Sequence, residues 1–398
     1  MKKPMIYLLL LATSPVWSNS TAPVFKNLNV NIVSSQIQPY VNQQSANQWF
    51  AYSVPATENT ASMCCFNQGY QAVCDLNKTQ HGFGSSSQSP TTENIHVFVH
   101  LNQGKVTRIM PVGDYCEVTA KGLTIDWLDG VSGQQSIQWL KDQVVAEQDK
   151  NETGGLYALS LHQGKQAAIT LFELAEANAG DTSEQAVFWL GQRQQDGFAY
   201  LKSLYQDMPV GEIRRKVNFA LSQNQHEDAV KLLQQIAQHD QDQEQQLDAI
   251  FWLSQADDVA DLPAFLLDML NTSDSANIKE KTIFSLSQIN NDEANQLLVQ
   301  LVKDHKEAEV REKALFWLAQ NNPQQAKKAA LNLLKAGGTE AEQENAVFVL
   351  SQLPAKESAA ALFNIVRGNF GINIKKKAIF WLSQSDDADT LEKLAQLL

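Results

Sequence analysis

Few side chains in this 398-residue sequence have the type and spacing that metal or acid–base chemistry requires. His226 and Glu227 are adjacent, and such a pair can offer one imidazole and one carboxylate to a metal. The pair occurs once, and neighbouring segments carry Ala260-Asp261, Asp292-Glu293 or Lys356-Glu357 instead. One pair cannot complete a coordination shell, whereas a carboxylate at a helix start interacts favourably with the helix dipole. The sequence therefore favours an exposed helix start over a metal site.

His96 and His100 form a second pair, four residues apart on one face of an expected strand. At about 3.3 Å per residue their backbones lie roughly 13 Å apart, too far to share one metal ion. We expect ordinary surface or core histidines. The sequence also lacks a Gly-x-Ser-x-Gly motif, a Walker-type loop and a dinucleotide fingerprint. It therefore predicts no catalytic residue, no metal and no cofactor.

The four cysteines, Cys64, Cys65, Cys74 and Cys116, all precede the helical part of the chain. An even number in one short region of an exported protein predicts disulfides. Adjacent cysteines rarely bridge each other, so one of Cys64 and Cys65 should bond Cys74 and the other Cys116. A zinc site is the alternative, but there is no Cys-x-x-Cys and no histidine at ligand spacing.

The N-terminus predicts export. Lys2 and Lys3 precede the apolar run Ile6 to Ala12, and Ser18 and Ser20 are small residues suited to cleavage after Ser20. The apolar run is shorter than the roughly 20 residues of a spanning helix, although an uncleaved anchor is an alternative. We expect a signal peptide over 1–20 and a mature protein, periplasmic or secreted, with no membrane insertion. The net charge of −13 argues against nucleic acids and anionic membranes as partners.

Residues 21–131 predict a small β-rich domain carrying two disulfides. Leu28 to Ile32 alternate as in a half-buried strand, and Trp49 to Tyr52 form another candidate. Ile95 to Leu101, a turn at Asn102-Gln103-Gly104 and Lys105 to Met110 predict a hairpin. Residues 132–150 predict a connecting helix, Ser132 to about Gln148, and a linker, Asp149 to Gly155.

Residues 151–398 repeat a seven-residue pattern, seen almost unchanged in Ala249 to Gln255 and Ala378 to Gln384. Each copy has Phe at its third and Gln at its seventh position, and the copies are 31 to 33 residues apart. Such a period predicts two-helix units that stack into a mainly α fold, an α-solenoid of seven to eight repeats. The repeated residues are Phe188, Gln192, Phe219, Gln223, Phe251, Gln255, Phe284, Gln288, Phe316, Gln320, Phe348, Gln352, Phe380 and Gln384.

The unit with Val310-Arg311 opening its first helix, and Ala314 and Leu318-Ala319 inside it, resembles HEAT repeats of the phycobilisome-lyase type. With the export signal and the cysteine-bearing front domain, the chain resembles exported bacterial HEAT-repeat proteins. The resemblance covers about residues 134–398. It implies an ARM/HEAT-type superhelix that presents a surface to partners, and it transfers no catalytic residue. Deoxyhypusine hydroxylase is similar in architecture and holds two irons with repeated His-Glu pairs.

The Phe and Gln of each copy lie four residues apart, on one edge of a helix. We expect each Phe to pack between repeats and each Gln amide to satisfy backbone groups at the turn between its two helices, although a binding stripe is the alternative. Tryptophans alternate with smaller residues, which predicts core volume. The tryptophans are Trp189, Trp252, Trp317 and Trp381, and the smaller residues are Ala220, Ser285 and Val349.

These observations favour a non-enzymatic exported scaffold that binds a protein partner through the superhelix. One alternative is an enzyme of the HEAT-repeat oxidoreductase or lyase kind. Another is binding by the β-rich domain, with the solenoid as a spacer. Two basic runs stand at the start of first helices, Arg214-Arg215-Lys216 and Lys375-Lys376-Lys377. They are either solvated or they fix the position of an acidic partner along the array.

Overall fold

The computed structural model describes residues 24–67, 70–78, 82–84, 89–146, 154–177, 180–256, 259, 261–289 and 291–397. The predicted signal peptide lies outside these residues, as does most of the predicted linker. The chain divides between Met208 and Pro209 into two compact units. The sequence starts the helical array at residue 151, so the first helix pairs of the array belong to the first unit. Each unit is described by itself.

The first unit is built on a five-stranded sheet with strand order β2-β11-β3-β8-β9. The first three strands are parallel, and β8 and β9 form the predicted antiparallel hairpin. Its turn uses left-handed backbone at Gln103 and Gly104, with φ of 52° and 74°, as a tight hairpin requires. The strands are β2 (Asn29–Ser34), β3 (Gln48–Pro55), β8 (Asn94–Asn102), β9 (Lys105–Gly113) and β11 (Thr124–Asp129).

Two three-stranded sheets complete the β-rich part, with orders β1-β10-β6 and β5-β4-β7. Cys64 bonds Cys116 and Cys65 bonds Cys74, which is one of the two pairings that the sequence leaves open. All four sulfurs lie in the core, together with Phe98, Trp127 and other apolar side chains. The strands are β1 (Val24–Lys26), β4 (Cys64–Asn67), β5 (Tyr70–Ala72), β6 (Cys74–Asp75), β7 (Gly82–Gly84) and β10 (Glu117–Thr119).

The turn that follows α3 is hydrogen-bonded to the end of β3 in the main sheet. Thr57 N donates to Leu161 O (2.8 Å) and Gln163 N to Pro55 O (3.0 Å). Gly154 precedes α3 and has a left-handed backbone, with φ of 88°. It lies so close to β9 that a Cβ atom added to it would be 2.6 Å from the carbonyl oxygen of Ile109. The first array helix is therefore part of the β-rich unit. The helices are α1 (Ile37–Asn42), α2 (Gly133–Ala146), α3 (Gly155–Ser160), α4 (Lys165–Glu176), α5 (Asp181–Gln192) and α6 (Gln194–Asp207).

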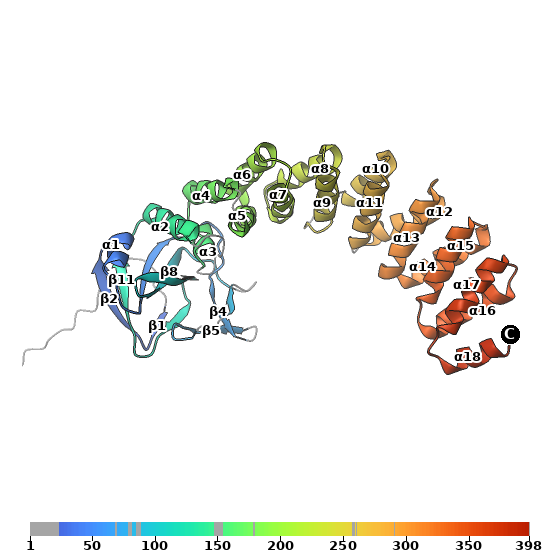
Figure 1. Ribbon diagram of the computed structural model, residues 1–398, viewed down its shortest axis with the longest axis horizontal. Coiled ribbons are helices and arrows are strands. Elements are labelled where there is room, and N and C mark those ends of the chain that lie inside the picture. The colour runs from blue at the N-terminus through green and yellow to red at the C-terminus, as the bar shows by residue number, and fades with distance from the viewer. Residues whose placement is uncertain are drawn as a thin grey trace, which may run out of the picture. The chain divides into compact units, whose positions relative to one another are not determined.

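The second unit is a stack of six two-helix repeats (Figure 1). The first helices α7, α9, α11, α13, α15 and α17 contact one another in sequence, and each ends near its copy of the repeated pattern. With the pairs α3/α4 and α5/α6 of the first unit, the described residues form eight helix pairs, in agreement with the predicted seven to eight repeats, and the chain is an α-solenoid with a β-rich N-terminal part. The bounds are α7 (Glu212–Gln223), α8 (Ala229–His239), α9 (Gln243–Leu253), α10 (Leu262–Thr272), α11 (Ala276–Gln288), α12 (Asp292–Asp304), α13 (Ala308–Asn321), α14 (Pro323–Ala336), α15 (Glu340–Ser351), α16 (Ala355–Arg367), α17 (Ile372–Ser383) and α18 (Ala388–Ala395).

Candidate functional site

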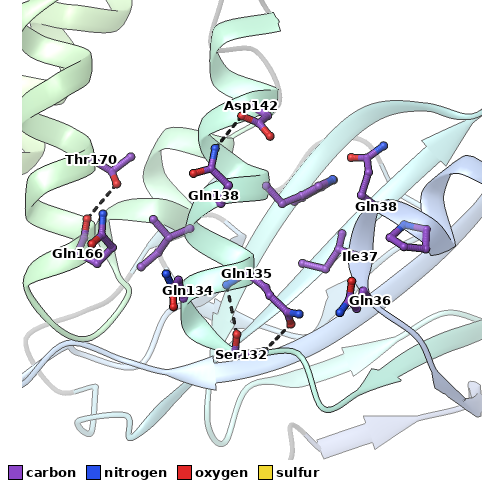
Figure 2. Close-up of a pocket in the computed structure, with 13 residues that line it drawn as sticks. Gln36, Ile37, Gln38, Ser132, Gln134, Gln135, Gln138, Asp142, Gln166 and Thr170 are labelled. Carbon is purple, nitrogen blue, oxygen red and sulfur yellow. Dashed lines mark hydrogen bonds between the residues drawn. The ribbon is translucent and has the colours of Figure 1, made fainter.

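A polar cleft of about 610 Å³ opens on the first unit between α1, α2 and α4 (Figure 2). Its lining contains six glutamines, one carboxylate and no lysine, arginine or histidine. Amide groups donate and accept hydrogen bonds, so this cleft suits a neutral polar ligand better than an anion. The lining residues are Gln36, Ile37, Gln38, Pro39, Ser132, Gln134, Gln135, Ile137, Gln138, Trp139, Asp142, Gln166 and Thr170.

Hydrogen bonds hold part of this lining in place. Ser132 N donates to Gln135 Oε1 (3.2 Å), and Gln135 N donates back to Ser132 Oγ (3.3 Å), a reciprocal cap at the start of α2. Gln138 Nε2 donates to Asp142 Oδ1 (3.0 Å), as Figure 2 shows. The indole N–H of Trp139 is buried and has no hydrogen-bond partner among the described residues. No sequence pattern indicates this cleft, because its walls come from three separated segments.

A series of buried hydrogen bonds connects α2 to the main sheet and to the turn after α3. His162 Nδ1 lies 2.8 Å from the carbonyl oxygen of Ala158, which only accepts, so Nδ1 carries the hydrogen. Nε2 then accepts from the Ser136 hydroxyl (2.7 Å), whose oxygen lies 2.9 Å from the Tyr52 hydroxyl. Burial lowers the pKa of His162 to about 4, so the imidazole is neutral at pH 7.

Arg193 also stabilises the turn after α3, through hydrogen bonds to its carbonyl groups. Its side chain is 1 % exposed. It donates to the carbonyl oxygens of Ser160 (2.8 Å), His162 (2.9 Å) and Gly164 (3.0 Å), and to the Asp196 carboxylate (2.7 Å). This guanidinium therefore occupies a structural site, in which its charge is balanced by one carboxylate and three backbone dipoles.

The two histidines of the hairpin strand have separate environments. His96 is fully buried, with Nε2 3.0 Å from Asp114 Oδ1, while Asp114 Oδ2 accepts from Thr92 Oγ1 and from the backbone N–H groups of Glu93 and Asn94. His100 contacts Thr107 and Asn47 instead. Each ring is thus engaged by its own neighbours, and the pair does not converge on one site.

His226 and Glu227 lie in the turn before α8. The backbone N–H of Asp228 donates to His226 Nδ1 (3.1 Å), and His226 N donates to Asn224 Oδ1 (3.0 Å), while Glu227 is exposed. These bonds shape the turn. Within the described residues, one group has the proximity of metal ligands, Cys64, Cys74 and Cys116, and all three sulfurs are in disulfides.

In the second unit the first helices carry a stripe of aromatic rings. Phe219 contacts Trp252 (ring centroids 4.6 Å apart), Phe284 contacts Trp317 (4.8 Å), and Phe348 contacts Trp381 (5.4 Å), each across two consecutive repeats. The rings are only partly buried, and Phe380 is 51 % exposed. We call Phe219, Phe251, Trp252, Phe284, Phe316, Trp317, Phe348, Phe380 and Trp381 the aromatic stripe.

The aromatic stripe agrees only in part with the sequence prediction that these rings pack in the core between repeats. The rings do contact the neighbouring repeat, but the tryptophans do not fill a closed core, since one face of the first-helix layer stays open to solvent. In the first unit Trp189 is likewise partly exposed and contacts Phe188 (4.8 Å) and Tyr157 (4.8 Å). An open row of half-buried aromatic rings is typical of a contact surface.

The seven repeated glutamines are exposed. In five of them Nε2 donates to the hydroxyl of the preceding serine at 3.0 to 3.3 Å, as Gln352 does to Ser351, and that hydroxyl donates to the carbonyl oxygen of the repeat's phenylalanine. The expected bonds to backbone groups at the turn are therefore replaced by a bond to a serine. Gln192 and Gln320 follow Gly191 and Ala319, which have no hydroxyl.

Ion pairs also link consecutive repeats. The Arg311 guanidinium lies 2.5 Å from buried Glu342 and lowers the pKa of that carboxyl. One residue of a predicted basic run is used in this way, since Lys377 of α17 pairs with Glu344 of α15 (3.1 Å). Arg214 of α7 pairs instead with Asp240, at the end of α8 in the same repeat (2.5 Å). Across the described residues, no helix combines the length and the apolar character that crossing a membrane needs.

No family model matches this chain. No curated protein matches it either. Similar solved structures include the Escherichia coli protein YibA, with 19% identity, a TM-score of 0.35, and coverage of 62% of this chain and 96% of that one. Human deoxyhypusine hydroxylase in complex with glycerol is 15% identical, with a TM-score of 0.28 and coverage of 63% and 96%. The complex of CpcE and CpcF of phycocyanin lyase from Nostoc sp. PCC7120 is 17% identical, with a TM-score of 0.27 and coverage of 59% and 94%.

These identities and scores are too low to carry an argument about activity. Helical repeat proteins with and without an enzymatic role share such architectures. The chain is an α-solenoid of two-helix repeats with a disulfide-bonded β-rich N-terminal part.

Proposed function

We propose that this protein is an exported, non-enzymatic scaffold that binds a protein partner through the aromatic stripe of the second unit. The observation that supports this proposal is the partial exposure of aromatic rings along consecutive first helices. Aromatic side chains are enriched at protein–protein interfaces because they offer a large contact area at a small cost in side-chain entropy. The exposed glutamines beside them provide hydrogen-bonding groups at each repeat.

The site is tested by photocrosslinking the full chain in its native envelope. Phe380 is replaced by p-benzoylphenylalanine, since its ring is 51 % exposed and the replacement removes little packing. Exposed Lys328, on the second helix α14, is the matched control position. We expect one protein to crosslink from position 380 and not from 328. Equal crosslinking from both positions, or none from 380, would argue against the stripe as the interface.

The cleft of the first unit supports a second candidate, recognition by the β-rich part with the solenoid as a spacer. Its volume of about 610 Å³ is within the range of ligand pockets. The same crosslinker at exposed Gln134 or Gln138 distinguishes the two, because capture from these positions and not from Phe380 would place binding on the first unit. Point replacements are preferable to truncation near residue 150, since the sheet is hydrogen-bonded to the chain around Leu161.

A further inference from the structure

Consecutive first helices of the second unit are joined by a recurring lysine–glutamate pair. Lys313 Nζ lies 2.7 Å from Glu280 Oε1, and Lys377 Nζ lies 3.1 Å from Glu344 Oε2. In both pairs the lysine stands three residues before the phenylalanine of its repeat, and the glutamate stands four residues before the phenylalanine of the preceding repeat. The stacking of the repeats therefore brings these two positions together.

Lys281 occupies the lysine position of α11, three residues before Phe284, but the position that should hold its glutamate is Leu247, four residues before Phe251. No carboxylate of the described residues lies within ion-pair distance of Lys281. Its ammonium instead lies 5.4 Å from the centroid of the Phe251 ring and 5.5 Å from that of Phe284. The two rings are stacked, with centroids 6.2 Å apart, and they hold the cation by cation–π attraction.

Lys281 lines a surface hollow of about 310 Å³. The other lining residues are Leu247, Asn277, Glu280, Phe284 and Trp317. The charge of Glu280 is balanced by Lys313. Asp248, next to Leu247, interacts electrostatically with Lys281, but it also interacts with Arg215. The hollow thus combines apolar walls, one amide and a cation that lacks the carboxylate found in two other repeats.

We infer that this hollow, which we call the Lys281 hollow, binds an acidic side chain that neighbours an apolar side chain on a partner polypeptide. The apolar side chain contacts Leu247, Phe284 and Trp317, and the carboxylate pairs with Lys281. A nucleic-acid phosphate backbone does not fit, because it needs several cations in a row and Glu280 stands on the same rim. This inference rests on the proposed function and names the chemistry of its partner.

The probe is a short N-acetylated, C-amidated peptide with a central Leu-Glu, titrated into the full-length ¹⁵N-labelled protein. The indole N–H signal of Trp317, assigned with Trp317→Phe, reports binding in the hollow. A Leu-Gln peptide removes the charge, and a peptide ending in Leu with a free C-terminus tests the other source of a carboxylate. We expect the Leu-Gln peptide to bind about tenfold more weakly than the Leu-Glu peptide. The C-terminal Leu peptide should bind more weakly than the Leu-Glu peptide, and tighter binding by it would overturn the assignment to an acidic side chain.

Two variants make the test specific. Lys281→Gln removes the cation and should weaken Leu-Glu binding about tenfold. Leu247→Glu rebuilds the ion pair seen at Lys313 and Lys377, so it should abolish peptide binding while leaving the fold intact. Lys377→Gln, the same position in a repeat that has its glutamate, is the matched control and should bind the peptide normally.

Full-strength binding to Leu247→Glu, or equal binding of the Leu-Glu and Leu-Gln peptides by the unmodified chain, would overturn the inference. The proposed function would then still stand if crosslinking from Phe380 identified a partner. Conversely, peptide binding that depends on Lys281, without any crosslink from Phe380, would keep the Lys281 hollow as a carboxylate site and remove the wider stripe from the interface.

Discussion

Nε2 of His162 lies 2.7 Å from Oγ of Ser136, in the interior of the first unit, and this bond joins α2 to the turn that follows α3. His162 is 1 % exposed and Ser136 is fully buried. A protonated imidazole could not accept this bond, and it would place an uncompensated charge beside Arg193, whose charge also lowers the pKa of His162.

Acid should therefore destabilise the first unit through His162. The pKa of His162 in the folded state is about 4, below its ordinary value of 6.5 in an unfolded chain, so the unfolded state binds the extra proton. The stabilisation is complete above about pH 6.5 and is lost as the pH falls towards 4, by at most about 3 kcal/mol. Urea unfolding at a series of pH values measures the free energy of unfolding. In the control variant His162→Gln this free energy should depend less steeply on pH. Parallel pH profiles for the two proteins would contradict the assignment.

Removing the Arg193 side chain should be strongly destabilising. Arg193→Met leaves the carbonyl groups of Ser160, His162 and Gly164 without their donor, and we expect a loss of about 3–5 kcal/mol. Lys202→Met, at an exposed position of α6, should change the free energy of unfolding by less than about 0.5 kcal/mol. Thermal unfolding of the full chain compares them. A small effect at Arg193 would show that the turn after α3 is held by other contacts.

Positions within the repeated seven-residue pattern should differ in their contribution to the free energy of unfolding. Leu318 is fully buried, so Leu318→Ala should cost about 2–5 kcal/mol. Phe316 is partly exposed, and Phe316→Ala should cost clearly less, whereas replacing exposed Lys306 should cost almost nothing. Chemical denaturation of the three variants gives the order. A larger loss at Phe316 than at Leu318 would mean that the stripe is core and not contact surface.

The two disulfides should contribute unequally. In the loop-entropy description, a bond that closes 52 residues stabilises by about 4 kcal/mol and one that closes 9 residues by about 3 kcal/mol. The paired variant Cys64→Ser with Cys116→Ser should therefore unfold at lower denaturant than Cys65→Ser with Cys74→Ser. Mapping of the native bonds by peptide mass spectrometry tests the pairing itself, and a Cys64–Cys74 peptide would refute it.

Much of the architecture follows from local pattern. The 31- to 33-residue period of Phe and Gln identifies helix pairs, because residues four apart share one helix edge wherever the helix lies. The hairpin around Gln103-Gly104 is also readable, since its turn chemistry and its alternation are both local. The even count of cysteines in one short region likewise indicates a bonded framework, without its pairing.

Tertiary structure decided what these local patterns leave open. The pairing of Cys64 with Cys116, the chain from Tyr52 through Ser136 to His162, and the glutamine-lined cleft each join segments far apart in the sequence. The exposure of the aromatic stripe is a similar case. The helix period shows which side chains share a face, but only the packing of one repeat on the next determines which face is covered. The same packing places Lys281 opposite Leu247, where the corresponding lysines Lys313 and Lys377 have a glutamate.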